Sequence, residues 1–114
     1  MALLLKQRDN RSLPRVDFCS NIRFQIRGKP DFDNAITKDI SFGGLRFASD
    51  RFVPTSTPIM LEINVLNRVL RPIARVAWST PLPHSSRNQT GVEFVEFNIL
   101  ESRYLKDFIN MQLG

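Results

Sequence analysis

The strongest constraint on the fold of this chain is a repeated alternation of apolar and polar residues with a period of two. In residues 16–27, one face of an extended segment carries the apolar side chains of Val16, Phe18, Ile22, Phe24 and Ile26. The same pattern recurs, between turn residues such as the GKPD of 28–31, in the segments 35–41, 45–49, 59–65, 69–79 and 92–97. Six short strands at near-regular spacing, with no helical period between them, predict an all-β barrel or sandwich.

The period changes near the C-terminus, where the apolar residues adopt helical spacing. The residues that follow this spacing are Leu100, Tyr104, Leu105, Phe108 and Ile109. Asn98 and Glu101 form an Asn-x-x-Glu start that is close to a capping box. The sequence therefore predicts one amphipathic helix over about 99–111, which packs on the barrel or plugs it.

The length and composition fit a single globular domain. The chain has 114 residues, of which 42% are hydrophobic and 24% charged, as in proteins that bury a core of their own. Cys19 is the only cysteine, which excludes an internal disulfide framework and favours a reducing compartment. The opening MALLL is too short for a signal sequence, and no apolar run approaches the roughly 20 residues of a membrane span. We therefore expect a cytoplasmic protein without a membrane-spanning segment.

The basic charge of the chain favours an anionic partner. The formal net charge is +5, and only four of the 16 basic residues are lysines. Arginine offers a planar fork that binds phosphate and base edges through two hydrogen bonds and stacks on aromatic rings. This composition favours a shaped anion over diffuse charge attraction, although a solvated basic surface would have the same composition.

Signals for catalysis are weak. The only histidine, His84, stands in a Pro/Ser-rich loop, and Asp39 stands where a nucleophile elbow around Ser41 would need a glycine. The carboxylates show no metal-ligand spacing, and no glycine-rich phosphate loop opens a helix. We therefore expect a binding protein that is not an enzyme and has no metal or cofactor.

The segment RSLPR at 11–15 places two arginines ahead of the first strand. Pro14 favours an extended conformation for the residue before it, so Arg11 and Arg15 would lie roughly 13 Å apart. That separation suits two anionic groups, or the two sides of one large ligand. Guanine, for example, offers O6 and N7 to an arginine fork and a flat face for stacking. The alternative is a solvated basic arm.

The segment DISFGG at 39–44 combines polar side chains with two glycines. On a strand, Asp39 and Ser41 would share one face while Ile40 points into the core. Gly43 and Gly44 remove side chains just beyond, so that a ligand or a neighbouring backbone can approach closely. The result would be a small polar shelf, and the alternative is an ordinary Gly-Gly bend.

Taken together, these motifs make the chain resemble the PilZ domain family. The shared features are an RxxxR arm, a first strand, DxSxxG at the end of the second strand, and an all-β domain closed by a helix. The segments ARVAWS (74–79) and GVEFVEF (91–97) extend the resemblance over about 8–111. It implies a six-stranded antiparallel split barrel with a C-terminal helix, which binds the bacterial second messenger cyclic di-GMP.

The resemblance also implies roles for particular residues. Arg11 and Arg15 would grip guanine and phosphate from a flexible N-terminal arm, residues 1–15, that closes over the ligand. Asp39, Ser41 and Gly44 would fill the DxSxxG positions. Asp39 would accept guanine N–H groups or orient an arginine, and Ser41 would bond the base edge or a phosphate. The remainder, residues 16–114, would form the barrel and its helix and would signal to a protein partner.

Two further residues are candidates for the same site. Arg46 follows Gly44 by two positions and would lie near the shelf, or it would be ordinary surface. Trp78 falls in phase with Ala74 and Val76, so it would either join the core or stack on a base.

Two other functions stay open from the sequence. One is an interaction module of the same fold that binds no nucleotide. The other, which is less favoured, is a small barrel that binds single-stranded nucleic acid. Such binding would fall steeply with salt.

Overall fold

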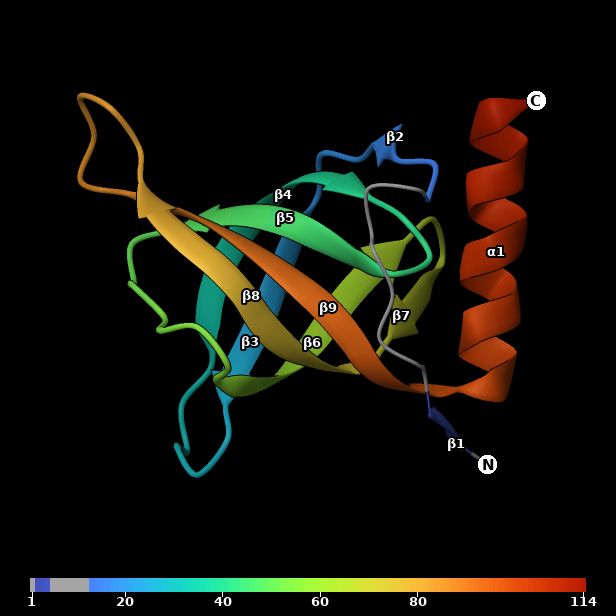
Figure 1. Ribbon diagram of the computed structural model, residues 1–114. Helices are drawn as coiled ribbons and strands as arrows, with labels where there is room; N and C mark the ends of the chain where they lie inside the picture. Colours follow the sequence, from blue (N-terminus) through green and yellow to red (C-terminus); the bar gives the residue numbers. More distant parts are fainter. Residues whose placement is uncertain (1, 5–12) are drawn as a thin grey trace.

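The computed structural model describes residues 2–4 and 13–114 of the chain. The described residues form nine strands and one helix (Figure 1). The elements are β1 (Ala2–Leu4), β2 (Val16–Asp17), β3 (Asn21–Ile26), β4 (Asp33–Ile40), β5 (Gly44–Ser49), β6 (Pro58–Val65), β7 (Arg68–Leu70), β8 (Ile73–Pro81), β9 (Asn88–Asn98) and α1 (Ile99–Leu113).

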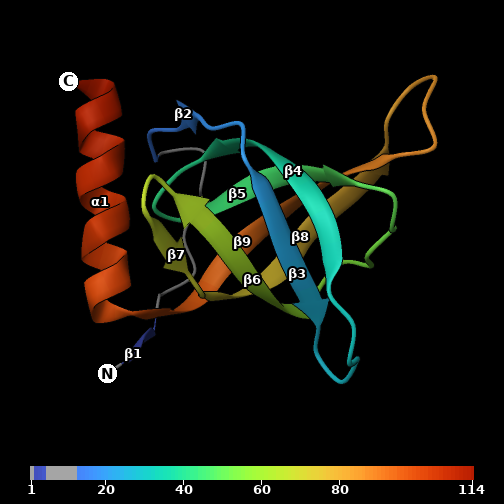
Figure 2. The same cartoon turned by 180° about the vertical axis from the view of Figure 1, so that it is seen from behind.

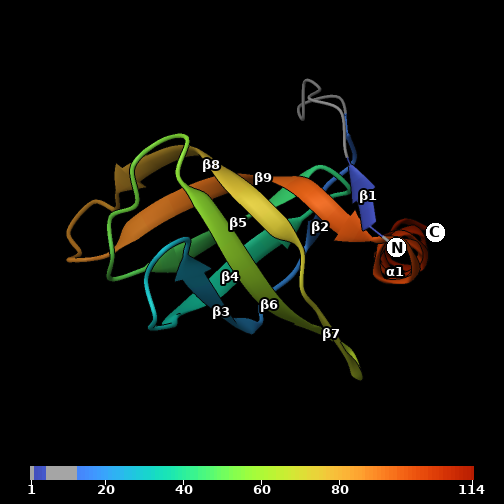
Figure 3. The same ribbon diagram turned by 90° about the horizontal axis from the view of Figure 1, so that it is seen from below.

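Six of the strands close into an antiparallel barrel. Around it, β3 pairs with β4, β4 with β5, β5 with β9, β9 with β8, β8 with β6, and β6 with β3 again. Figures 1 and 3 show the strands of this barrel from two directions. The predicted six-stranded antiparallel barrel is therefore confirmed.

Three short strands extend this ring and were not predicted as separate elements. Strand β1 pairs with β9, β2 with β4, and β7 with β6. The predicted strand at 16–27 is split into β2 and β3, and the one at 69–79 is split into β7 and β8 around Pro72. Proline has no N–H to donate to a ladder, so it interrupts the pairing at that point. The β8–β9 hairpin is longer than expected, because its strands extend to Pro81 and back from Asn88.

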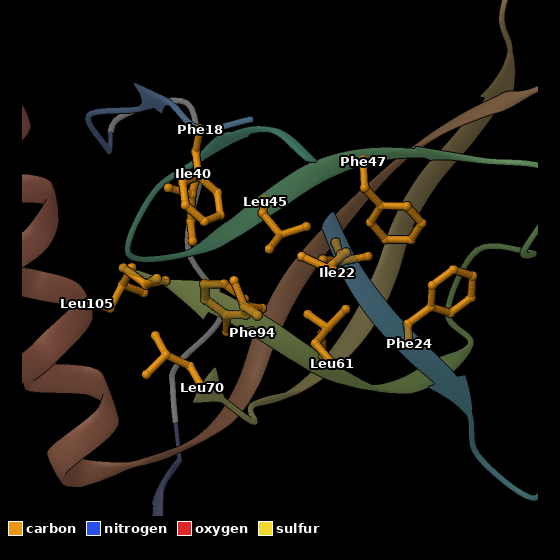
Figure 4. Close-up of a cluster of buried hydrophobic side chains, with 14 of the residues drawn as sticks. Phe18, Ile22, Phe24, Ile40, Leu45, Phe47, Leu61, Leu70, Phe94 and Leu105 are labelled. Carbon is orange, nitrogen blue, oxygen red and sulfur yellow. The ribbon is translucent and has the colours of Figure 1, made fainter. Parts of the chain in front are cut away.

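The core fills the barrel with side chains from all six strands (Figure 4). Phe24 and Phe47 pack against each other with ring centroids 5.0 Å apart. The buried hydrophobic side chains include Ile22, Phe24, Ile40, Leu45, Phe47, Ile59, Leu61, Ile63, Val65, Leu70, Ala74, Val76, Val92, Phe94 and Phe97. Burial of this apolar surface is the main force that stabilises the barrel.

The predicted helix is confirmed, and it covers one end of the barrel (Figures 1 and 2). Its Leu105, Phe108 and Ile109 are buried, and the rings of Phe108 and Phe18 pack edge to face with their centroids 5.7 Å apart. Asn98 caps the helix by accepting hydrogen bonds from the backbone N–H groups of residues 100 and 101. No helix among the described residues is long and apolar enough to cross a membrane.

A bulge in β4 changes which side chains face outward. In β4, Thr37 pairs with Phe47 and Asp39 with Arg46, which leaves Lys38 as an extra residue. An extra residue reverses the alternation beyond it. Ile36 is consequently 40% exposed although Ile40 is fully buried. Strict alternation through the segment 35–41 would place both isoleucines on one face, and the bulge is the reason that they face opposite ways.

Candidate functional site

Four residues from four strands form one cross-strand row on the outer surface of the barrel. Asp39 of β4 pairs with Arg46 of β5, Arg46 pairs with Gly91 of β9, and Gly91 pairs with Trp78 of β8. Leu45, which precedes Arg46 on β5, is buried in the core. Arg46 and the row to which it belongs therefore face the outside of the barrel. Three of the four, all except Gly91, are residues that the sequence singled out.

Trp78 reaches this row through a bulge in β8. Val76 pairs with Val92 and Trp78 with Gly91, so that Ala77 is the extra residue. Val76 is buried, whereas Trp78 is 37% exposed. The expected phase of the strand would have put Trp78 in the core. The bulge instead turns the indole onto the outer surface.

Asp39 is the centre of an ion-pair cluster. Its Oδ1 accepts hydrogen bonds from Nε of Arg15 at 3.1 Å and from Nε of Arg46 at 3.0 Å. Its Oδ2 accepts from Nε of Arg46 at 2.9 Å and also pairs with Nη2 of that residue. Asp39 itself is only 6% exposed, and both guanidinium groups lie against its carboxylate. The carboxylate therefore fixes both arginines in place.

The same cluster lowers the pKa of the Asp39 carboxyl. Burial raises the pKa of its carboxyl, but the hydrogen bonds and positive charges of Arg46 and Arg15 outweigh burial and lower the pKa below its ordinary value. Conversely, the hydrogen bond to Asp39 raises the pKa of Arg46. Asp39 is therefore a carboxylate at neutral pH, and the cluster of one negative and two positive groups keeps a net positive charge.

A pocket of about 290 Å³ opens beside this cluster. The lining residues are Arg15, Leu45, Arg46, Ala77, Trp78, Gly91 and Val92. Two guanidinium groups, an indole and a few apolar side chains therefore face one space. Such a combination suits a flat ligand with anionic groups, because arginine forks bind oxyanions and rings stack on the indole.

Ser41 lies differently from expectation. Strand β4 ends at Ile40, so Ser41 belongs to the turn and is fully buried. Its Oγ accepts the N–H of Gly43 at 3.1 Å, and its own N–H donates to the Gly44 carbonyl at 2.8 Å. Ser41 and Asp39 therefore form no shared shelf, because the polar groups of Ser41 are used within the turn.

Gly44 is needed for a close approach between two strands. A Cβ at this position would overlap the backbone carbonyl of Val92 on β9. Only a glycine fits there without moving a strand. In this structure, Gly44 shapes the barrel and does not line the pocket.

One expected site residue belongs to the first part of the chain. Arg11 lies outside the described residues, so its place relative to the pocket stays a prediction.

Sequence reasoning missed Gly91 and Ala77. A glycine inside a strand is a known sign of close approach and could have drawn attention to Gly91, but an ordinary alanine carries no signal of a bulge. Within residues 2–4 and 13–114, no group of three His, Cys, Asp or Glu side chains is placed to hold a metal ion.

Comparisons with known proteins agree with this fold. The structure is similar to the inhibitor of motility (MotI/DgrA) of Bacillus subtilis, with a TM-score of 0.76 and 19% identity, over 95% of this chain and 54% of that one. The chain therefore spans about half the length of that protein. It is also similar to the PilZ domain of CeSA from a cellulose-synthesizing bacterium, with a TM-score of 0.60 and 14% identity, over 89% of this chain and 96% of that one.

Of two comparisons of the sequence with known proteins, one gives a match. A search of curated proteins found no match. The family model of the PilZ domain, however, matches residues 9–111, which is most of the chain, and on this evidence the protein belongs to the PilZ domain family.

Proposed function

We propose that this protein is a single-domain receptor for cyclic di-GMP and that it catalyses no reaction. Membership of the PilZ family supports a module of the type that binds this nucleotide. The observation that carries the proposal is that Asp39 accepts hydrogen bonds from Arg15 and Arg46 at the edge of the pocket. A carboxylate that fixes two guanidinium groups before the ligand arrives lowers the entropy that binding must lose.

The chemistry of the pocket matches that of the nucleotide. Each guanine offers O6 and N7 to an arginine fork, and each phosphate offers oxygens for two parallel hydrogen bonds. Trp78 provides a ring on which a base can stack. Arg15 therefore serves as the second arginine of RxxxR, and Arg46 adds a cation that the motif does not include. Ser41 and Gly44 support binding by shaping the β4–β5 turn.

We also propose that the N-terminal arm transmits the signal. In this proposal, Arg11 joins Arg15 on the ligand, the segment closes over the pocket, and the rearranged surface is recognised by a protein partner in the cytoplasm. Limited proteolysis with and without cyclic di-GMP tests the closure. The bound protein should resist cleavage before Val16, and equal cleavage in both states would contradict the proposal.

Calorimetric titration with cyclic di-GMP tests the function directly, with cyclic di-AMP as the matched control. We expect saturable binding of the guanine nucleotide and much weaker binding of the adenine one, because adenine lacks O6. The absence of heat with either ligand would favour an interaction module that binds no nucleotide. Binding of unrelated oligonucleotides that falls steeply with salt would favour the single-stranded nucleic-acid function.

A further inference from the structure

The row Asp39–Arg46–Gly91–Trp78 contains one position without a side chain. Gly91 lies in the middle of β9, flanked by Arg46 on β5 and by Trp78 on β8. The backbone at Gly91 is not in the left-handed region, so conformational freedom does not explain a glycine here. The reason for a glycine at this position is that the space outside its Cα is already filled.

That space is occupied by the indole of Trp78. A Cβ built on Gly91 would overlap Nε1, Cε2 and Cζ2 of the indole, and these are the three atoms nearest to it. The tryptophan side chain therefore lies across β9, over the bare backbone of Gly91. Because Gly91 itself pairs with Arg46, the indole is brought toward that arginine, and all three residues line the same pocket.

Gly44 provides a contrast on a neighbouring strand. A Cβ there would meet the carbonyl oxygen and carbon of Val92 and the Cα of Glu93, which are backbone atoms of β9. A side chain at Gly44 would thus push two strands apart, whereas one at Gly91 would displace the indole of Trp78 and no backbone. The two glycines therefore serve different purposes.

We propose that Gly91 is a positioning residue for the ligand pocket. By lacking a Cβ it lets the Trp78 indole lie across β9 beside Arg46, where one face of the ring is available to a planar purine base. This inference rests on the proposed function for its ligand, but the placement of the indole is a property of the protein alone. In this proposal Gly91 acts on binding through the position of Trp78.

The first test uses the protein without ligand. Trp78 is the only tryptophan, so its fluorescence has a single source. Gly91→Ala should lift the indole from β9, shift its emission to the red and raise its quenching by acrylamide, with a far-UV spectrum like that of the wild type. Gly44→Ala is the matched control and should lower the melting temperature much more. Unchanged emission and quenching in Gly91→Ala would overturn the proposal.

The second test measures affinity for cyclic di-GMP in a double-mutant cycle. In the wild-type background, Gly91→Ala should weaken binding about fivefold or more, the loss expected when a base–aromatic stack is disturbed. In a Trp78→Ala background, the same change should have little further effect, because the side chain it displaces is gone. An equal loss in both backgrounds would show that Gly91 acts on the ligand directly, and would overturn the positioning role.

The two tests separate this inference from the proposed function. If the wild-type protein binds no cyclic di-GMP, the proposed function fails, and the fluorescence of Gly91→Ala still decides whether Gly91 places the indole. If Gly91→Ala lowers the melting temperature sharply, adding Trp78→Ala should restore it by vacating the space. A double variant that stays as unstable as Gly91→Ala would contradict the contact on which the proposal depends.

Discussion

Asp39 and Arg46 are paired twice, once as cross-strand neighbours in the β4–β5 ladder and once through carboxylate and guanidinium. The bulge at Lys38 produces this double pairing, because it places Asp39 on the outer surface directly opposite Arg46. Arg15, which precedes β2, then adds a second guanidinium to the same carboxylate. A local irregularity of one strand thus assembles the charged side of the pocket.

Removal of Arg15 should weaken ligand binding and leave the barrel folded. Arg15→Ala deletes one guanidinium, but Asp39 keeps its bonds to Arg46 and so is not left as an unpaired buried charge. We expect a loss of about 1–3 kcal/mol in binding free energy, measured by calorimetry. The control is Arg23→Ala, which breaks an ion pair with Glu62 outside the pocket. Equal affinity of the two variants would contradict the site.

Arg11 is expected to contribute in the same way, as the first arginine of the motif. Arg11→Ala should lower affinity, and the double variant with Arg15→Ala should bind more weakly than either single variant. Melting temperatures close to that of the wild type are expected for all three. Wild-type affinity in the double variant would remove the arm from the binding site.

The stability of the protein should depend on the ionisation of Asp39 in acid. Its pKa lies below the ordinary value of 3.8 in the folded state, so the unfolded chain binds a proton more readily. The contribution of Asp39 to stability is therefore complete above the unfolded pKa and is lost as the pH falls through the folded pKa. Urea unfolding from about pH 5 to pH 2 should show this loss in the wild type.

Asp39→Asn supplies the comparison for this pH dependence. The variant should be less stable than the wild type at neutral pH, and the difference should shrink as the medium becomes acidic. Asp31→Asn, at an exposed position in the β3–β4 turn, should follow the wild-type curve. A constant difference between Asp39→Asn and the wild type at every pH would mean that the ion pairs do not stabilise the fold.

The β4 bulge predicts opposite outcomes for two isoleucines that strict alternation places together. Ile40→Ala removes a fully buried side chain and should cost about 2–5 kcal/mol of unfolding free energy. Ile36→Ala removes a side chain that is 40% exposed and should cost less than about 1 kcal/mol. Chemical denaturation measures both. Similar losses would mean that the strand keeps a single face along its length.

These two isoleucines also show how far the sequence can predict the structure. Alternation identifies the barrel strands, and the change of period at Asn98 identifies the helix, because burial imposes those periods on the chain. Neither Lys38 nor Ala77 differs from its neighbours in a way that marks a bulge. A bulge depends on how two strands pair, and that pairing is set by the whole barrel.

The candidate site was predictable to a similar extent. Arg15 and Asp39 stand out through their motifs and Arg46 through its place just after DxSxxG, and the structure brings the three together. That Ser41 closes a turn and that Gly91 lies beneath Trp78 depends on register and on close approach of strands. Such features are absent from any single segment of sequence.

Trp78 should report directly on the ligand. Its indole is partly exposed and lines the pocket together with Arg15 and Arg46, so a base that enters there changes the surroundings of the only fluorophore of its kind in the chain. Titration with cyclic di-GMP should alter the emission and saturate at the stoichiometry found by calorimetry. Cyclic di-AMP should have a much smaller effect at the same concentrations.

Substitution at Trp78 then separates stacking from mere proximity. Trp78→Leu should lower affinity by about 1–3 kcal/mol, the usual worth of a base–aromatic stack, whereas Trp78→Phe keeps a ring and should lose less. Neither change should destabilise the barrel strongly, because the bulge at Ala77 holds the side chain outside the core. If emission is unchanged by ligand and Trp78→Leu binds like the wild type, the indole takes no part in recognition. Binding would then depend on the arginines that Asp39 holds in place.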